Sequence, residues 1–169
     1  MGSLLAPTIR AEAIPREETM PAIECSIEIN RPVAEVFAWI EDPEKAMLWQ
    51  ESVTKGEILE EREGKVGTRF REYVEEDGKG TWMTGEITEF VPTKKIGFAL
   101  DGEFNSVNVR FEVKPSGEGC QVTQKADIRF KGAARVFGLL AKKQIEAQMK
   151  RELGELKRLC EAGGEALAV

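Results

Sequence analysis

Few residues in this chain have side chains suited to catalysis or metal binding. The sequence contains no histidine, and its three cysteines, Cys25, Cys120 and Cys160, are scattered and form no CxxC pair. The lack of histidine excludes Ser-His-Asp and Cys-His nucleophile systems, histidine-ligated metals and the commonest general base near neutral pH. We therefore predict no metal site and no cofactor. Any reaction would depend on carboxylates, lysines, Tyr73 or ordered water.

One carboxylate occupies a position that suits acid–base chemistry. Glu72 is in phase with Phe70 and Val74, on the face of a predicted strand that we expect to be buried. Burial raises the pKa of a carboxyl group and would allow it to bind or protonate a ligand. Glutamate is seldom fully buried, so the favoured alternative is that Glu72 lies near a strand end, where it is solvated or paired with a nearby arginine. It is the candidate catalytic residue.

Amides and large apolar side chains are the other candidates for ligand binding. Gln124 occupies an inward slot of a predicted strand, where its amide needs a hydrogen-bond partner. Gln144 and Gln148 flank Ile145 on a predicted helix, and they either point inward or border the apolar stripe of that helix. Large apolar side chains complete the predicted set, although each also suits an ordinary core: Trp49, Phe70, Met83, Phe98 and Ile145.

The composition of the chain limits the kinds of binding partner that we expect. The chain has 169 residues, of which 41% are hydrophobic and 32% charged, and its net charge is −6. This charge argues against nucleic acid as a partner, and no run of about 20 apolar residues predicts a membrane span. Unpaired cysteines favour a reducing, cytoplasmic location. We expect a monomer or homodimer with a hydrophobic small molecule as its partner.

The stretch INRPVAEVFAWIEDPEKAMLW, residues 29–49, predicts two short helices directly after a first strand at 23–29. Pro32 suits the first position of one helix, with Asn30 close enough to help cap it. Asp42 and Pro43 repeat this pattern for the second helix. These helices are expected to form the end wall of a pocket, with Trp49 as its plug.

Alternating residues then predict six further strands, separated by turns rich in Gly, Pro and Asp. Short connections require antiparallel neighbours. A long helix at 133–162 follows, with an apolar stripe along one face. The strands are expected at about 53–62, 67–76, 81–91, 95–101, 105–114 and 119–130. The stripe comprises Phe137, Leu140, Ala141, Ile145, Met149, Leu153, Leu156 and Cys160.

The predicted fold class is α+β, a curved seven-stranded antiparallel sheet wrapped around the long C-terminal helix. A single helix does not fill a broad concave sheet, so a cavity is expected between them. We expect residues 21–162 to form one ligand-binding domain, with flexible tails at 1–20 and 163–169.

The segments IEINRPVAEVFAWIEDPEKAMLW and TGEITEFVPTKKIGF resemble the polyketide cyclase/dehydrase and lipid-transport family of the START-like, Bet v 1-like (SRPBCC) superfamily. The resemblance covers about residues 22–162 and implies the helix-grip fold. Family members include carriers, cyclases and stress proteins, so it implies no single activity. No catalytic residue matches by position.

Three functions are consistent with these observations. The first is a carrier or sensor that binds a hydrophobic or aromatic, lipid-like or polyketide-like molecule between sheet and helix. The second is a metal-free cyclase, dehydratase or isomerase that uses Glu72 or a cavity water. The third is a protein-interaction module whose cavity has collapsed, which would show an interior filled with large side chains and an exposed apolar patch.

Overall fold

The computed structural model describes residues 20–163. The predicted tails lie almost wholly outside these residues, at 1–19 and 164–169. Four side chains within the range are also outside the description: Arg135, Val136, Phe137 and Leu139.

A seven-stranded antiparallel sheet forms the main layer, with strand order β1-β7-β6-β5-β4-β3-β2. Every neighbour after β1 is also a neighbour in sequence, as short turns require. The strands are β1 (Ile23–Ile29), β2 (Val53–Glu60), β3 (Arg69–Glu76), β4 (Lys79–Val91), β5 (Lys95–Asp101), β6 (Asn105–Ser116) and β7 (Gly119–Phe130). The number and direction of strands are confirmed, and only their ends differ from the prediction, by up to two residues.

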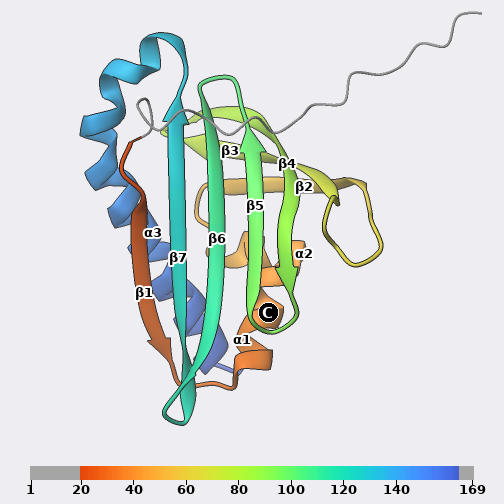
Figure 1. Cartoon of the computed structure of the whole chain (residues 1–169). Helices are drawn as coiled ribbons and strands as arrows, with labels where there is room; N and C mark the ends of the chain where they lie inside the picture. The colour runs from red at the N-terminus through yellow and green to blue at the C-terminus, as the bar shows by residue number, and fades with distance from the viewer. Residues whose placement is uncertain (1–19, 164–169) are drawn as a thin grey trace, which may run out of the picture.

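The sheet is strongly curved. In Figure 1, β1, β7, β6 and β5 run side by side, whereas β2 and β3 cross behind them at a steep angle. Register shifts between Ile87 and Glu89 on β4, and at two points of β2, interrupt the regular pairing on this half. Bulges of this kind increase the local bend and twist of a strand. They help the β2–β4 half to fold over the concave face.

The predicted helical corner is α1 (Val33–Glu41) and α2 (Pro43–Trp49). Asp42 caps α2 as predicted, because its carboxylate accepts from the backbone N–H groups of Glu44 and Lys45, and Pro43 opens the helix. The prediction for α1 was wrong. Pro32 is the N-cap residue rather than the first helical residue, and no side chain caps this end.

Asn30 has a different function from the predicted cap. Its backbone N–H donates to the carboxylate of Glu161, 2.9 Å away, near the end of the last helix. The residue therefore joins the end of β1 to α3, rather than the start of α1. Sequence proximity alone could not reveal this partner, which lies 131 residues away.

The long C-terminal helix is confirmed, although its first turn differs. Residues Gly132–Phe137 form a 3₁₀ helix, η2, and α3 runs from Gly138 to Glu161. Leu140 was expected in the buried stripe, but 76% of its surface is exposed. Because α3 begins only two residues earlier, Leu140 lies in its first turn, ahead of the buried part of the stripe. From Met149 onward the stripe is buried as predicted.

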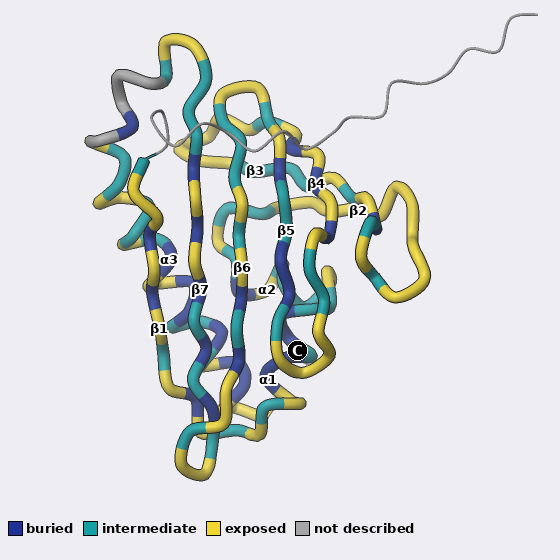
Figure 2. Tube along the Cα trace, in the orientation of Figure 1, coloured by how far each residue is buried: buried dark blue, intermediate teal, exposed yellow. Residues whose placement is uncertain are grey.

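The α3 helix packs mainly against β1, with further contacts to β7, α1 and α2. Figure 2 shows buried residues concentrated where α3, β1, β7 and the lower part of β6 meet. The core there includes Phe37, Ile29, Val122, Leu153 and Leu156, each at most 1% exposed. On β2, by contrast, nearly every residue is exposed. The helix thus covers one half of the concave face, and the β2–β3 side is less covered, whereas the inner residues of β4 are buried.

Candidate functional site

Trp49 anchors the end wall. Its side chain is 1% exposed, and its indole N–H donates to the backbone carbonyl of Trp39, 3.0 Å away. Since Trp39 belongs to α1 and Trp49 to α2, this bond holds the two short helices together. The predicted position of Trp49 in the end wall agrees with this geometry.

A row of aromatic rings extends from Trp49 across the concave face. Trp49 contacts Phe111 edge to face at 5.8 Å between ring centroids, Phe111 lies 6.5 Å from Phe98, and Phe98 lies 5.8 Å from Phe70. Edge-to-face pairs at these separations are favourable. The row therefore forms an apolar floor from α2 through β6 and β5 to β3.

Gly85 makes room for the end of this floor. It pairs with Phe70 across β3 and β4, and a Cβ atom at Gly85 would collide with the Phe70 ring. Any larger residue at this position would displace the ring. The glycine therefore lets Phe70 lie directly over the inner face of the sheet.

Several inner-face side chains remain half-buried, although they belong to central strands. They share the concave face with the buried core but lie toward the β3 side and the upper part of β5 and β6: Phe70, Glu72, Val74, Phe98, Val107 and Val109. Their exposed area faces the concave side, because strand alternation points them there. Met83, the partner of Glu72 on β4, is 6% exposed.

Glu72 lies on this inner face, as its phase predicted. The side chain is half-buried and forms no ion pair with another described side chain. Burial, and after it the negative charge of Glu152, raise the pKa of Glu72 from 4.5 to about 7. Glu72 is therefore present in both protonation states near neutral pH, and the alternative of pairing with an arginine does not describe its surroundings.

Glu152 of α3, which sequence reasoning missed, is near enough to Glu72 for its negative charge to raise the pKa of Glu72. It is 7% exposed, and burial raises its pKa, while a hydrogen bond from Gln148 opposes this rise. Glu152 lies three residues after Met149 and four before Leu156, both buried, so helical spacing could have placed it on the covered side. A charged residue in phase with a buried stripe was the available signal.

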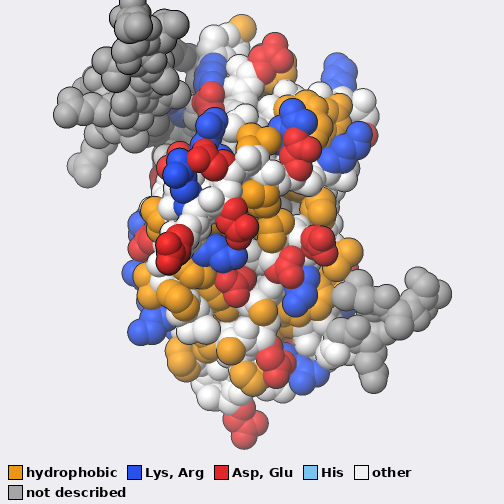
Figure 3. All heavy atoms as spheres, turned by 90° about the vertical axis from the view of Figure 1, so that its right-hand side faces the viewer, with side chains coloured by type: hydrophobic (Ala, Val, Ile, Leu, Met, Phe, Trp, Pro, Cys, Tyr) orange, Lys and Arg blue, Asp and Glu red, His pale blue; other side chains and the backbone are white. Residues whose placement is uncertain are grey.

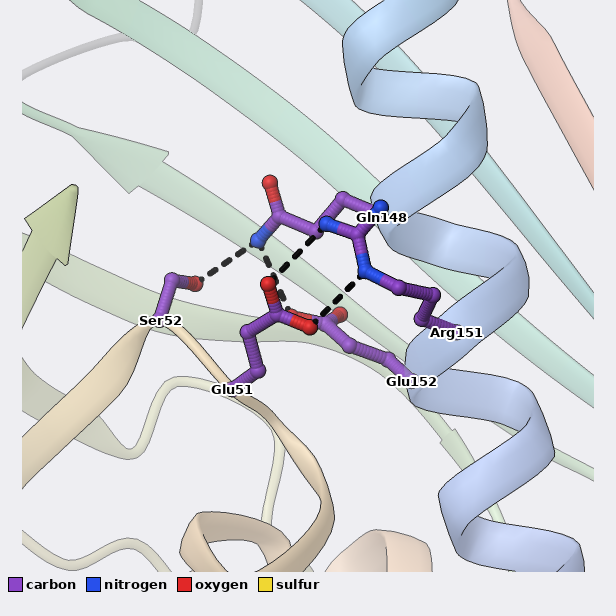
Figure 4. A network of polar contacts seen from close by, with 5 residues as sticks. All are labelled: Glu51, Ser52, Gln148, Arg151 and Glu152. Atoms are coloured by element: carbon purple, nitrogen blue, oxygen red, sulfur yellow. Dashed lines mark hydrogen bonds and ion pairs between the residues drawn. The ribbon is translucent and has the colours of Figure 1, made fainter. Parts of the chain in front are cut away.

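A polar network joins this part of α3 to the connection between α2 and β2 (Figure 4). Gln148 Nε2 donates to Ser52 Oγ and to Glu152 Oε1, each at 3.0 Å. Arg151 donates to both carboxylate oxygens of Glu51, at 2.9 and 3.1 Å. Bidentate arginine–carboxylate pairs fix geometry as well as charge. Gln148 is half-buried and thus points toward the connection between α2 and β2.

A groove of about 660 Å³ opens beside this network, between α2, the start of β2 and α3. Its walls combine apolar residues of α2 and β2 with charged residues of α3, among them Met47, Leu48, Trp49, Val53 and Glu152. Of the predicted ligand-binding residues, only Trp49 lines it. Both Trp49 and Glu152, which line the groove, are also buried residues of the interior.

The remaining predicted ligand-binding residues differ in how far they are buried. Gln124 is 6% exposed on the inner face of β7, and its Oε1 has no hydrogen-bond partner among the described atoms. Ile145 is half-buried against the core. Gln144 is exposed, so the alternative that it borders the stripe describes it better, and it is not part of the site.

The surface at the right of Figure 1 carries acidic, basic and hydrophobic groups side by side, without an expanse of one charge (Figure 3). Exposed apolar residues of the molecule include Ile58 and Leu59 of β2 and Val66 of the following loop, each close to half exposed. Over residues 20–163, no helix has the length and hydrophobicity to span a bilayer. Within the same residues, no group of three or more His, Cys, Asp or Glu side chains is placed to hold a metal ion.

Comparison with known proteins gives a family and a fold. Residues 20–161 match the sequence profile of the polyketide cyclase/dehydrase and lipid transport family. None of the curated protein sequences matches the chain.

Solved structures with the same fold include three that cover most of the chain. TTHA0849 of Thermus thermophilus is 21% identical with a TM-score of 0.73, covering 85% of this chain and 99% of its own. A START superfamily protein of Mycobacterium smegmatis has 17% identity, a TM-score of 0.74 and coverages of 83% and 97%. The ZhuI aromatase/cyclase of Streptomyces sp. R1128 has 16% identity, a TM-score of 0.70 and coverages of 87% and 97%.

Proposed function

Because the chain belongs to the polyketide cyclase/dehydrase and lipid transport family, we propose that it binds an apolar or aromatic small molecule between α3 and the inner face of the sheet, as a carrier or sensor. One observation carries this proposal. Apolar side chains on the concave face, such as Phe98 and Val109, remain partly accessible although strand alternation points them inward. Removing such area from water is the main favourable term in binding apolar ligands.

The polar groups of the interior support a ligand that is not purely hydrocarbon. Small-molecule sites combine apolar walls with a few polar groups that set orientation. Here the walls are the aromatic row, and the polar groups are Glu72, Glu152, Gln148 and the unpartnered oxygen of Gln124. The aromatic row fills part of the interior, which is also what a protein-interaction module with a collapsed cavity would show. The accessible side chains on the inner face favour the ligand-binding function.

Titration with Nile red, a neutral dye whose emission reports apolar surroundings, tests the proposal. Ile145→Trp adds bulk where α3 faces the core, and Leu140→Trp adds the same side chain at an exposed position of the same helix. We expect saturable binding by wild type and Leu140→Trp, and at least tenfold weaker binding by Ile145→Trp with an unchanged circular dichroism spectrum. An equal dye response in all three folded proteins would place the dye on the surface and refute the proposal.

A second candidate function is acid–base catalysis by Glu72. The pKa of about 7 favours it, since a general acid or base works best when its pKa lies near the operating pH. The ZhuI neighbour is an aromatase/cyclase, but at 16% identity the likeness shows only a shared fold. A Glu72→Gln variant that still binds a polyketide-like substrate but no longer converts it would establish this function. Cytoplasmic location and a monomeric or homodimeric state remain predictions.

A further inference from the structure

β2 is the most exposed strand of the sheet and has a free edge. It is last in the strand order, and β3 is the only described strand that pairs with it. Every residue from Thr54 to Glu60 is exposed, including the large apolar side chains of Ile58 and Leu59, each 48% exposed. Backbone N–H and C=O groups along such an edge can pair with a further strand.

Two features protect this edge against arbitrary strands. The register with β3 shifts on both sides of the regular stretch 55–58, so that Thr54 and Leu59 are extra residues of β2. Within the regular stretch, Lys55 and Glu57 carry charges. Bulges and charged residues are common means by which edge strands reject other strands. A strand that pairs here must therefore bring matching charges.

A second copy of β2 brings those charges. Lys55 and Glu57 lie on either side of Gly56, so antiparallel pairing about a two-fold axis at Gly56 places each Lys55 opposite Glu57 of the second copy. Sliding the strands by two residues would oppose lysine to lysine or glutamate to glutamate. Sliding them by one residue would set one face of the sheet against the other. Opposite charges are favourable in cross-strand pairs and like charges are unfavourable.

The outer face of the neighbouring strand β3 is compatible with this pairing. Glu57 forms an ion pair with Arg71, its cross-strand partner. Lys55 Nζ lies 5.4 Å from the centre of the Tyr73 ring, and Lys55 has no carboxylate partner among the described side chains. The carboxylate of Glu57 in a second copy would supply that partner, between the Lys55 ammonium and its own Arg71.

Apolar residues are distributed about Gly56 in the same symmetric way. On one side, Val53 lines the groove of about 660 Å³, whose wall includes Leu48, 45% exposed. On the other side are the exposed Ile58 and Leu59. A two-fold axis at Gly56 therefore places Ile58 and Leu59 of each copy beside the groove of the other. Apolar area on both surfaces would be removed from water.

We propose that this edge is the interface of a homodimer, in which two β2 strands pair antiparallel about Gly56 and Ile58 and Leu59 of each copy cover the groove of the other. The interface is isologous, because one surface serves both copies. It is independent of the proposed ligand, since it uses the free edge of β2 and the groove rather than the inner face of the sheet.

Exchange of the charges tests this interface. Sedimentation velocity of the full chain, from about 1 μM to about 0.5 mM, should show a reversible dimer. Lys55→Glu and Glu57→Lys should each raise the dissociation constant of the dimer at least about tenfold, because each creates two like-charge pairs. An equimolar mixture of the two variants should associate within about threefold of wild type, since two glutamates of one chain then face two lysines of the other.

Matched variants separate the interface from general surface effects. Glu24→Lys makes the same charge change as Glu57→Lys on β1, the other edge strand, and should leave the dissociation constant unchanged. Leu59→Ser should weaken the dimer, whereas Val91→Ser, at an exposed valine at the end of β4, should not. Circular dichroism would confirm that each variant is folded.

A cysteine at the two-fold axis tests the register. A Cβ atom at Gly56 would be in ordinary contact, 3.7 Å from Met47 Sδ, so Gly56→Cys fits the fold. Directly paired residues of antiparallel strands have Cα atoms about 4.5–5.5 Å apart, which suits a disulfide. Mild oxidation should therefore link Gly56→Cys into a covalent dimer and leave Glu60→Cys, on the same strand, as a monomer. The three natural cysteines are buried.

Three results would overturn the homodimer: a wild type that stays monomeric over the whole range, a dimer that Lys55→Glu leaves intact, or a mixture of the charge variants that fails to associate. A monomeric wild type would also be the outcome if the β2 edge served only a strand of another protein. None of these results affects the proposed function, because dye binding is measured separately.

Discussion

At the scale of single residues, Glu72 shows how a fold can make one carboxylate unlike the others. The chain has 30 acidic residues, but the described ones are mostly exposed and many are paired with lysine or arginine. Glu72 has apolar neighbours, including its cross-strand partner Met83. The charged group that shifts its pKa is another acid, Glu152. Both influences disfavour the ionised form.

Stability should therefore depend on pH through Glu72. Its folded pKa of about 7 exceeds the ordinary 4.5, so the folded protein holds a proton that the unfolded chain releases between these values. The contribution of Glu72 to stability is then fully present below about pH 4.5 and is lost as the pH rises to about 7. The loss is at most about 3–4 kcal/mol, because the pKa difference is about 2.5 units and one unit corresponds to about 1.4 kcal/mol.

The variant Glu72→Gln should remove most of this loss. Urea unfolding at pH 5 and pH 8 would give its free energy of unfolding, and the change from pH 5 to pH 8 should be about 1–3 kcal/mol smaller than in wild type. Glu75→Gln, on the exposed face of the same strand, should keep the wild-type dependence. Parallel curves for wild type and Glu72→Gln would contradict the assigned environment of Glu72.

Sequence patterns correctly predicted the positions of residues that depend only on the local structure of a single strand or helix. Strand alternation placed Glu72 and Gln124 on the inner face, and the Asp42–Pro43 pair correctly marked the start of α2. Glu152 was missed although its spacing from Met149 and Leu156 was a usable signal, and the residues that complete its polar surroundings, 51–52, lie about 100 positions away in sequence. Asn30 was misassigned for the same physical reason, since its partner Glu161 lies on a distant element.

At the scale of elements, the connection between α2 and β2 is the key link to α3. The helix packs mainly on β1, at the opposite edge of the sheet from β2. Beside the contacts with α2, the polar network of Glu51, Ser52, Gln148, Arg151 and Glu152 ties the β2 end to the helix (Figure 4). The backbone carbonyl of Ser52 also accepts from the backbone N–H of Glu75 at 2.8 Å, which extends the link to β3.

Breaking this link should loosen the β2–β3 end without unfolding the domain. Arg151→Gln removes the bidentate pair with Glu51, and we expect hydrogen exchange at the Glu75 amide to accelerate up to about fivefold, because an exposed ion pair contributes at most about 1 kcal/mol. Arg158→Gln is the matched control, since it breaks an equally exposed pair that lies within α3. Equal acceleration in both variants would show that Glu51–Arg151 is not a specific link.

At the scale of the whole molecule, the two halves of the concave face differ in how well they are covered. On the β1–β7 side, α3 seals a close-packed core that contains all three free cysteines, Cys25, Cys120 and Cys160, each at most 5% exposed. On the β2–β3 side, inner residues such as Val74 remain accessible. Curvature follows from alternation and bulges within strands, but the position of α3 over one half depends on side-chain packing across the molecule, which a sequence pattern does not specify.

Thiol labelling should reveal this difference directly. Val74→Cys places a thiol on the accessible side, and Val113→Cys makes the same exchange at an inner position of β6 that is 2% exposed. With N-ethylmaleimide at pH 7, mass spectrometry should show one rapid addition to native Val74→Cys. The natural thiols and the thiol of Val113→Cys should react only as fast as the protein unfolds, because burial excludes the reagent and raises the pKa of buried thiols, that of Cys160 to about 12. A bound apolar ligand should slow only the reaction of Val74→Cys. Similar labelling rates for Val74→Cys and Val113→Cys would instead show that both halves of the concave face are equally covered.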